Sequence, residues 1–142
     1  MDYCTSAKLV ELFGEPEIIA LSRLHDPAGM TIDMVRVNAA IAYAEDEINS
    51  YIGLRYTSPF TSVPIVLGGK AADIARYQLD SIHPREDVRK RYEDAIKWLI
   101  LVASGKIDLS LGAGSAPQLP ITPGAGSVGS LIPGQVFDLR GY

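Results

Sequence analysis

Residues 33–53 read DMVRVNAAIAYAEDEINSYIG, and this stretch decides the fold of the chain. Its apolar side chains recur every three or four residues, at Val37, Ile41, Ala44, Ile48 and Ile52. That spacing places them on one face of an α-helix, opposite the charged and polar residues. Asp33 or Thr31 is the expected N-terminal cap, and Gly53 is the expected stop. The stretch therefore predicts a long helix with one buried stripe.

The same spacing and similar cap residues predict further helices on both sides of this one. Their expected ranges are residues 5–13, 16–21, 65–81 and 84–102. Gly14 ends the first of them, and Pro16 and Pro84 suit first turns, where a backbone N–H has no helical partner. The connection with Pro59 and Pro64 cannot be helix interior. The fold class is therefore all-α, a small bundle of about four to five helices.

The helix expected at residues 65–81 has small alanines that permit close packing. Its inward positions are Leu67, Ala71, Ile74, Ala75 and Gln78 or Leu79. Its outward positions, which we expect to face water, are Lys70, Asp73, Arg76 and Asp80. The pattern is typical of a helix on the surface of a globular core.

The last helix becomes apolar nearly all round toward its end. Its expected stripe is Val88, Tyr92, Ala95 or Ile96, Leu99 and Val102. Trp98, Ile100 and Leu101 lie off this stripe. Two interpretations stay open: a second surface that contacts another subunit, or deeper burial within the same core.

The chain divides into a helical body, residues 1–104, and an extended arm rich in glycine and proline, residues 105–142. No charged residue occurs between Asp108 and Asp138. A disordered tail normally stays soluble through charge and a shortage of large apolar groups, whereas this arm carries apolar anchors. The best candidates for binding a partner are Leu131, Ile132, Val136, Phe137 and Leu139.

Composition argues against several classes of protein. The net charge is −4 and the arm is neutral, so the body is acidic, which disfavours nucleic-acid binding driven by phosphate contacts. One cysteine cannot form an intrachain disulfide, which suits assembly in a reducing cytoplasm. The apolar stretch from Trp98 to Ala103 is too short to span a membrane, and the N-terminus does not resemble a signal peptide.

The residues that could carry catalysis are few. A nucleophilic Ser, Thr or Cys needs a nearby base, and only His25 and His83 are available. His83 immediately precedes Pro84 and suits a helix entry, and Cys4 falls in a terminus that we expect to fray. We therefore expect no enzymatic activity and no cofactor.

Several short motifs, in order and spacing, resemble a family of small virion proteins from Mu-like bacteriophages and prophages. They are Leu9-Val10-Glu11-Leu12-Phe13-Gly14; Ile32-Asp33 with Ala40, Ala44, Glu47, Ile48 and Tyr51; Arg55-Tyr56, Pro59 and Val63-Pro64; Ala72-Asp73-Ile74-Ala75-Arg76-Tyr77; Arg91-Tyr92-Glu93-Asp94-Ala95; and Trp98-Leu99 with Gly105-Lys106-Ile107. The resemblance covers roughly residues 5–110. We expect the arm beyond it to lie outside the shared pattern.

That family is similar to the head–tail adaptor, or head-completion, proteins of tailed phages. The resemblance implies a structural protein of the virion neck that forms a ring below the portal, twelvefold if it follows the usual portal symmetry, and continues the DNA channel. The implied partners are the portal protein, neighbouring copies, the next neck or tail-terminator protein and passing DNA. Many relatives carry a loop resembling a calcium site, but Asp26 and Asp33 alone provide too few ligands here, so we expect no metal.

Two charged groups allow more than one interpretation. Arg85, Arg89, Lys90 and Arg91 alternate with carboxylates, which is typical of a solvated helix face and could also pair neighbouring subunits. Glu45, Asp46 and Glu47 suit the polar face of a helix, or a channel wall that repels DNA phosphates. The alternative function is a small helical regulatory or DNA-binding module, which would need an exposed basic recognition helix.

Overall fold

The computed structural model describes residues 2–56 and 62–109 of the chain. Its helices are α1 (Ser6–Phe13), α2 (Glu15–Ser22), α3 (Met34–Ile52), α4 (Ile65–Leu79) and α5 (Glu86–Ala103). No β-strand occurs within these two ranges. The all-α prediction is confirmed.

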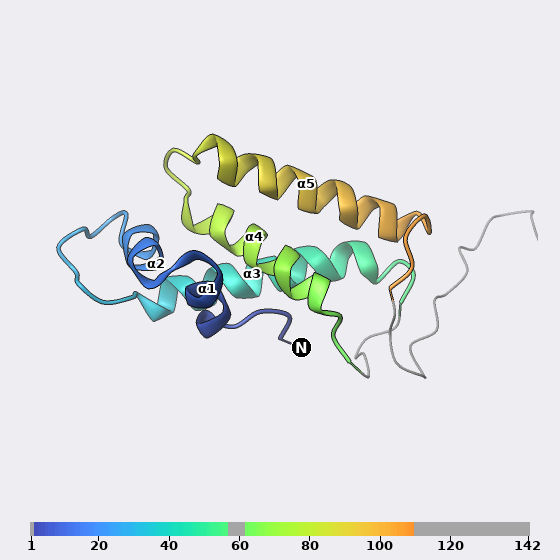
Figure 1. The fold of residues 1–142 in the computed structure, drawn as a ribbon, viewed down its shortest axis with the longest axis horizontal. Helices are drawn as coiled ribbons and strands as arrows, with labels where there is room; N and C mark the ends of the chain where they lie inside the picture. The colour runs from blue at the N-terminus through green and yellow to red at the C-terminus, as the bar shows by residue number, and fades with distance from the viewer. Residues whose placement is uncertain (1, 57–61, 110–142) are drawn as a thin grey trace, which may run out of the picture.

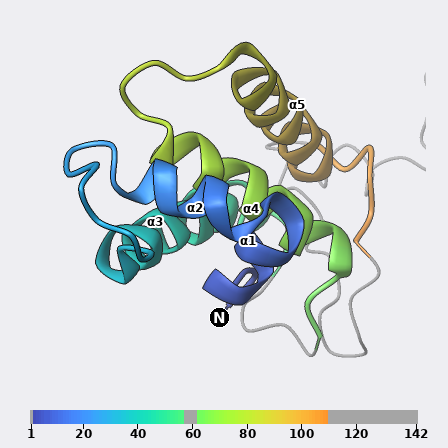
Figure 2. The same ribbon diagram turned by 60° about the vertical axis from the view of Figure 1, so that its left-hand side comes forward.

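Three long helices form the body of the bundle (Figure 1). α4 packs between α3 and α5, and each of these neighbours runs antiparallel to it. α1 and α2 lie across one side, where both contact α3 and α4 (Figure 2). The antiparallel order brings the end of α3, the start of α4 and the end of α5 to the same end of the bundle.

Side-chain caps fix the starts of α1 and α3, and a glycine motif fixes the end of α5. Thr5 accepts a hydrogen bond from the Lys8 N–H at the start of α1, and Asp33 accepts from two backbone N–H groups at the start of α3. α5 ends in a Schellman motif, in which Gly105 adopts a φ of 85° and the Lys106 N–H bonds the Leu101 carbonyl. A positive φ favours glycine at this position.

The core comes from one stripe on each long helix. Its fully buried members include Leu9, Ile18, Val37, Ile48, Ile52, Leu67, Ile74, Leu99 and Val102. The stripe predicted for α3 is buried at all five of its positions, and on α4 it is Leu79 rather than Gln78 that is buried. Of the two alternative stripe positions on α5, Ala95 is buried and Ile96 is only half-buried.

Two parts of the sequence interpretation are wrong. Arg76 and Asp80, expected to face water, are 7% and 5% exposed, because α1, α2 and the start of α5 close over that side of α4. The N-terminus does not fray at Tyr3 and Cys4, which are buried against the core. Residues 105–109, the start of the predicted arm, also contact the body through Ile107 and Leu109.

None of the helices in the described ranges is long and apolar enough to cross a membrane.

Candidate functional site

An ion network around Arg76 joins α2, α4 and the start of α5. The Arg76 Nη2 atom lies 2.6 Å from Glu17 Oε1, and Arg76 Nε donates to the same oxygen at 2.7 Å. Arg85 contacts Glu17 at 2.7 Å and Asp80 at 3.2 Å, and the bond to Glu17 raises the pKa of Arg85. The Arg76 guanidinium also lies 4.5 Å from the centre of the Phe13 ring. This network holds helices together rather than presenting a charge to a ligand.

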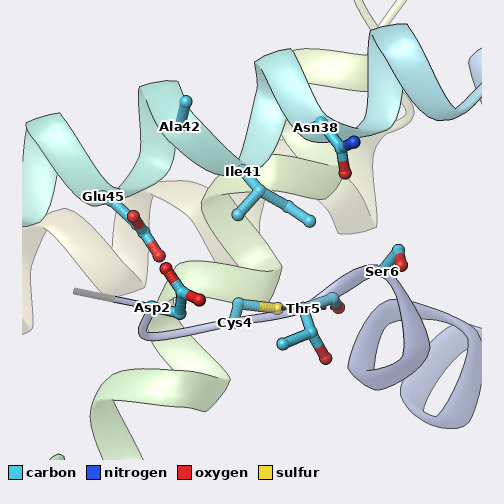
Figure 3. Close-up of a pocket in the computed structure, with 8 residues that line it drawn as sticks. All are labelled: Asp2, Cys4, Thr5, Ser6, Asn38, Ile41, Ala42 and Glu45. Carbon is cyan, nitrogen blue, oxygen red and sulfur yellow. Dashed lines mark hydrogen bonds between the residues drawn. The ribbon is translucent and has the colours of Figure 1, made fainter.

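The N-terminal segment, residues 2–5, lies along α3 and α4 (Figure 3). The Tyr3 N–H donates to Glu45 Oε1 at 2.8 Å, and the Tyr3 hydroxyl donates to Asn49 Oδ1 at 2.5 Å. On α4, a Cβ atom at Gly68 would lie only 3.0 Å from the Tyr3 carbonyl oxygen, so glycine permits the close approach. These contacts dock the segment that the sequence interpretation expected to be loose.

A hollow of about 300 Å³ lies beside this segment, between it and α3. It is lined by Asp2, Cys4, Thr5, Ser6, Asn38, Ile41, Ala42 and Glu45. Figure 3 shows the Asp2 and Glu45 carboxylates turned toward each other and the Cys4 sulfur directed along the segment toward Thr5. Burial raises the pKa of the Cys4 thiol to about 11, so this sulfur is a poor nucleophile at neutral pH.

We expect alkaline pH to weaken the docking of the N-terminal segment. Burial raises the pKa of Tyr3 to about 12 and that of Cys4 to about 11, from ordinary values of 10.0 and 9.0. Both groups lose protons more easily in the unfolded chain, so their stabilising contribution is complete below about pH 9 and falls as the pH rises toward 12. The urea midpoint should therefore drop between about pH 8 and about pH 10.5.

Cys4→Ser is the matched control for this prediction, because serine has a similar shape and also carries a donor for the Thr5 carbonyl but does not titrate in this range. Its urea midpoint should fall less than that of the unchanged protein over the same pH interval. Equal losses in the two proteins would contradict a contribution from the thiol.

The three predicted channel carboxylates point in different directions from α3. Glu45 accepts the Tyr3 N–H, and Glu47 accepts the Tyr92 hydroxyl at 2.8 Å, which ties α3 to α5. Asp46 is exposed. Their role at a DNA channel stays a prediction, and Asp46 is the member of the trio left most open to solvent.

Exposed apolar side chains gather at the end of the bundle where α3 and α5 finish and α4 begins. We call this surface the apolar end, and it comprises Leu54, Ile65, Val66, Ile100 and Leu101. Trp98, predicted with Ile100 and Leu101, is instead half-buried against the core, with the Lys70 ammonium 5.8 Å from its ring. Deeper burial therefore holds for Trp98, whereas Ile100 and Leu101 are exposed and their contact with another subunit stays a prediction.

The chain leaves α5 beside the apolar end and is held there by Arg55. Arg55 Nη1 lies 3.0 Å from Asp108 Oδ1 and donates to the Val102 carbonyl at 3.4 Å. The Leu109 N–H donates to the Tyr56 hydroxyl at 2.9 Å. These contacts set the point from which the C-terminal residues depart. The predicted anchors from Leu131 to Leu139 lie outside the described residues.

A second apolar surface, which the sequence analysis did not single out, is a groove between α2 and the loop that follows it. Two adjoining hollows of about 350 and 630 Å³ share Pro16, Ile19, Pro27 and Gly29. We call this surface the α2 groove; its other lining residues are Glu15, Ala20, Arg23, Leu24 and Met30. In the sequence, the loop shows only the apolar residues Pro27 and Met30, and exposed apolar residues by themselves indicate no site.

Residues suited to catalysis or metal binding do not come together in the part of the chain that the structure describes. His25 and His83 are exposed on separate connections, and no three His, Cys, Asp or Glu side chains form a metal-binding group among the described residues. Asp33 caps α3, and Asp26 pairs with Arg23 at 3.5 Å.

The basic residues of α5 are largely engaged by carboxylates. Arg91 lies 3.4 Å from Asp73, and Arg89 lies 3.9 Å from Glu93. Arg85 belongs to the network around Arg76. These pairs leave little of the positive face that a recognition helix needs.

Comparison with known sequences identifies the family. The family described as "Bacteriophage Mu, Gp36" matches residues 3–128. The chain belongs to this family. It is 40% identical over 85 residues to "Mu-like prophage FluMu protein gp36" of Haemophilus influenzae, which covers 60% of each chain. It is 30% identical over 108 residues to "Gene product J" of Escherichia phage Mu, which covers 76% of each chain.

The Mu Gp36 match extends further than the sequence analysis expected. It includes all five helices and continues to residue 128, whereas the arm beyond about residue 110 was expected to fall outside the shared pattern. Short motifs in a segment rich in glycine and proline are hard to recognise in a single sequence. The alignment with the Haemophilus influenzae protein spans less than two thirds of that protein.

Proposed function

We propose that this phage protein is a structural component of the virion, a head–tail connector that forms a ring below the portal and continues the DNA channel toward the tail. Its place is the virion neck, after synthesis and assembly in the host cytoplasm. The ring contains twelve copies, matching the symmetry usual for portals. Its partners are the portal protein, neighbouring copies and the next neck or tail-terminator protein, and DNA passes through without sequence-specific binding.

The apolar end carries this proposal. Leu54 and Ile65 are 67% and 90% exposed, and Ile100 and Leu101 are exposed near the end of α5, which finishes at the same end of the bundle. Single exposed apolar residues are common, but a group at one end of a small bundle is typical of a surface that another protein covers. Membership of the Mu Gp36 family makes other virion proteins the natural partners.

The DNA-binding alternative has no comparable observation in its favour. The carboxylates paired with Arg85, Arg89 and Arg91 reduce the positive potential of α5, and the whole chain is acidic. Of the three carboxylates predicted to line the channel, Asp46 is the exposed one, and in the connector its charge would repel DNA phosphates and keep the genome from binding.

An image of purified virions tests the proposal. The protein should occupy a ring between the portal and the tail. The double variant Ile100→Asp/Leu101→Asp should be depleted from particles, because charges at the apolar end oppose its burial. Leu12→Asp is the control, since Leu12 is 46% exposed on α1, away from that end. Absence of the unchanged protein from the neck would overturn the proposal.

A further inference from the structure

The loop that forms one wall of the α2 groove is held in place by Arg23. Its Nε donates to the Thr31 carbonyl, its Nη2 lies 3.4 Å from the Thr31 hydroxyl, and its Nη1 lies 3.5 Å from Asp26. A Cβ atom at Gly29 would overlap the Arg23 guanidinium, so the loop closes tightly over this side chain. A loop held by these contacts loses little conformational entropy when a ligand binds.

The lining of the groove favours an extended, apolar ligand. Pro16 and Pro27 lack a backbone N–H, and Ile19, Leu24 and Met30 add apolar side chains. Met30 is 88% exposed, so its thioether has no cover in the described chain. An apolar groove of this kind gains binding energy when it buries the apolar side chains of a ligand.

The C-terminal segment, residues 127–142, has the matching chemistry. It carries apolar side chains on both sides of Pro133-Gly134, and its charged residues are Asp138 and Arg140. Glu15, at the rim of the groove, offers an opposite charge to Arg140.

The positions of the groove and of the chain exit are compatible with a segment supplied by a second copy. The chain departs at Leu109, beside the end of α5, whereas the α2 groove lies at the opposite end of the bundle (Figures 1 and 2). Residues 110–142 could span up to about 110 Å when extended, several times the roughly 27 Å length of α5. The chain length therefore allows contact with a neighbour.

We propose that the α2 groove of one copy binds residues 127–142 of a second copy. The inference rests on the proposed ring, because a contact between different surfaces of identical subunits is heterologous and closes a ring when the rotation permits. Each subunit then offers a groove to one neighbour and its C-terminal segment to the other.

The test uses the full-length protein with the photoreactive residue p-benzoyl-phenylalanine in place of Phe137, irradiated in phage-producing cells. We expect a crosslinked dimer on a denaturing gel, with the crosslink mapped by mass spectrometry to residues 15–30. Met30→Glu should lower the dimer yield about tenfold, because it places a charge in the apolar groove. Val35→Glu is the control, since Val35 is 81% exposed on α3 and does not line the groove.

The outcomes separate this inference from the proposed function. A crosslink within one chain, to another protein, or to other residues of a second copy overturns the inference, even if the protein is found in the neck. The inference is also overturned if no crosslink forms, or if Met30→Glu and Val35→Glu give equal yields of the crosslinked dimer. A dimer linked through the groove, in a protein absent from the neck, would instead overturn the proposed function alone.

Discussion

Glu17→Ala is expected to lower the free energy of unfolding by about 3 kcal/mol or more, since removing one partner of a buried pair leaves an uncompensated charge. Glu17 contacts both Arg76 and Arg85, and Arg76 has only 9% of its side chain exposed. The nearest remaining carboxylate of Arg76, on Asp87, is 3.8 Å away and largely exposed. Urea unfolding followed by circular dichroism measures the loss.

Glu11→Ala is the matched control for this prediction. Glu11 pairs with Lys8 at 3.3 Å on the exposed face of α1, where a salt bridge contributes at most about 1 kcal/mol. The double variant Glu17→Leu/Arg76→Met should recover much of the stability, because apolar residues of similar volume often replace a buried pair without loss. Similar losses for Glu11→Ala and Glu17→Ala would contradict the role assigned to burial.

Removal of residues 127–142 is expected to reduce the yield of infectious particles by about 100-fold or more, while the helical body stays folded. The physical reason is avidity: the proposed ring would engage many C-terminal segments at once, so loss of each weak contact would be multiplied across the assembly. Complementation of a phage that lacks the gene measures the yield, and circular dichroism of the purified protein measures helix content.

A full-length variant separates loss of the apolar anchors from loss of chain length. It replaces Leu131, Ile132, Val136, Phe137 and Leu139 with serine. Its yield should fall as far as that of the truncated protein, because the anchors have to offset the cost of ordering the segment, about 1 to 2 kcal/mol of backbone entropy per residue. The control Gln135→Ser should assemble normally. If truncated protein gave normal numbers of infectious particles, residues 127–142 would have no part in assembly.

Helix positions were predictable because their determinants are local. Asp33 and Thr5 cap helices through their own side chains, and Gly53 and Gly14 follow the last helical residues. The α3 stripe was predictable for the same reason, since a period of 3.6 residues places its members on one face whatever packs against them.

The faces of α4 were only partly predictable. A charged residue normally faces water, but Arg76 and Asp80 find partners on α2 and at the start of α5, which are distant in the sequence. Burial of a charge depends on such partners, and a single sequence does not show them. The orientations of the predicted channel carboxylates were also not predictable. Tyr3 and Tyr92 donate hydrogen bonds to Glu45 and Glu47 only after the chain folds.

The sequence by itself determined the helical class, the helix positions to within about two residues and the buried stripes, because periodicity and capping act within a few residues of chain. Pro84, expected in the first turn of the last helix, precedes α5, and α4 ends at Leu79 rather than at Ser81. Only the tertiary structure decided which charges are buried, that Tyr3 and Cys4 dock on α3 and α4, and that apolar surface remains at the apolar end and the α2 groove. These features depend on contacts between distant segments. Whether an apolar residue is covered is set by what packs over it rather than by its neighbours in sequence.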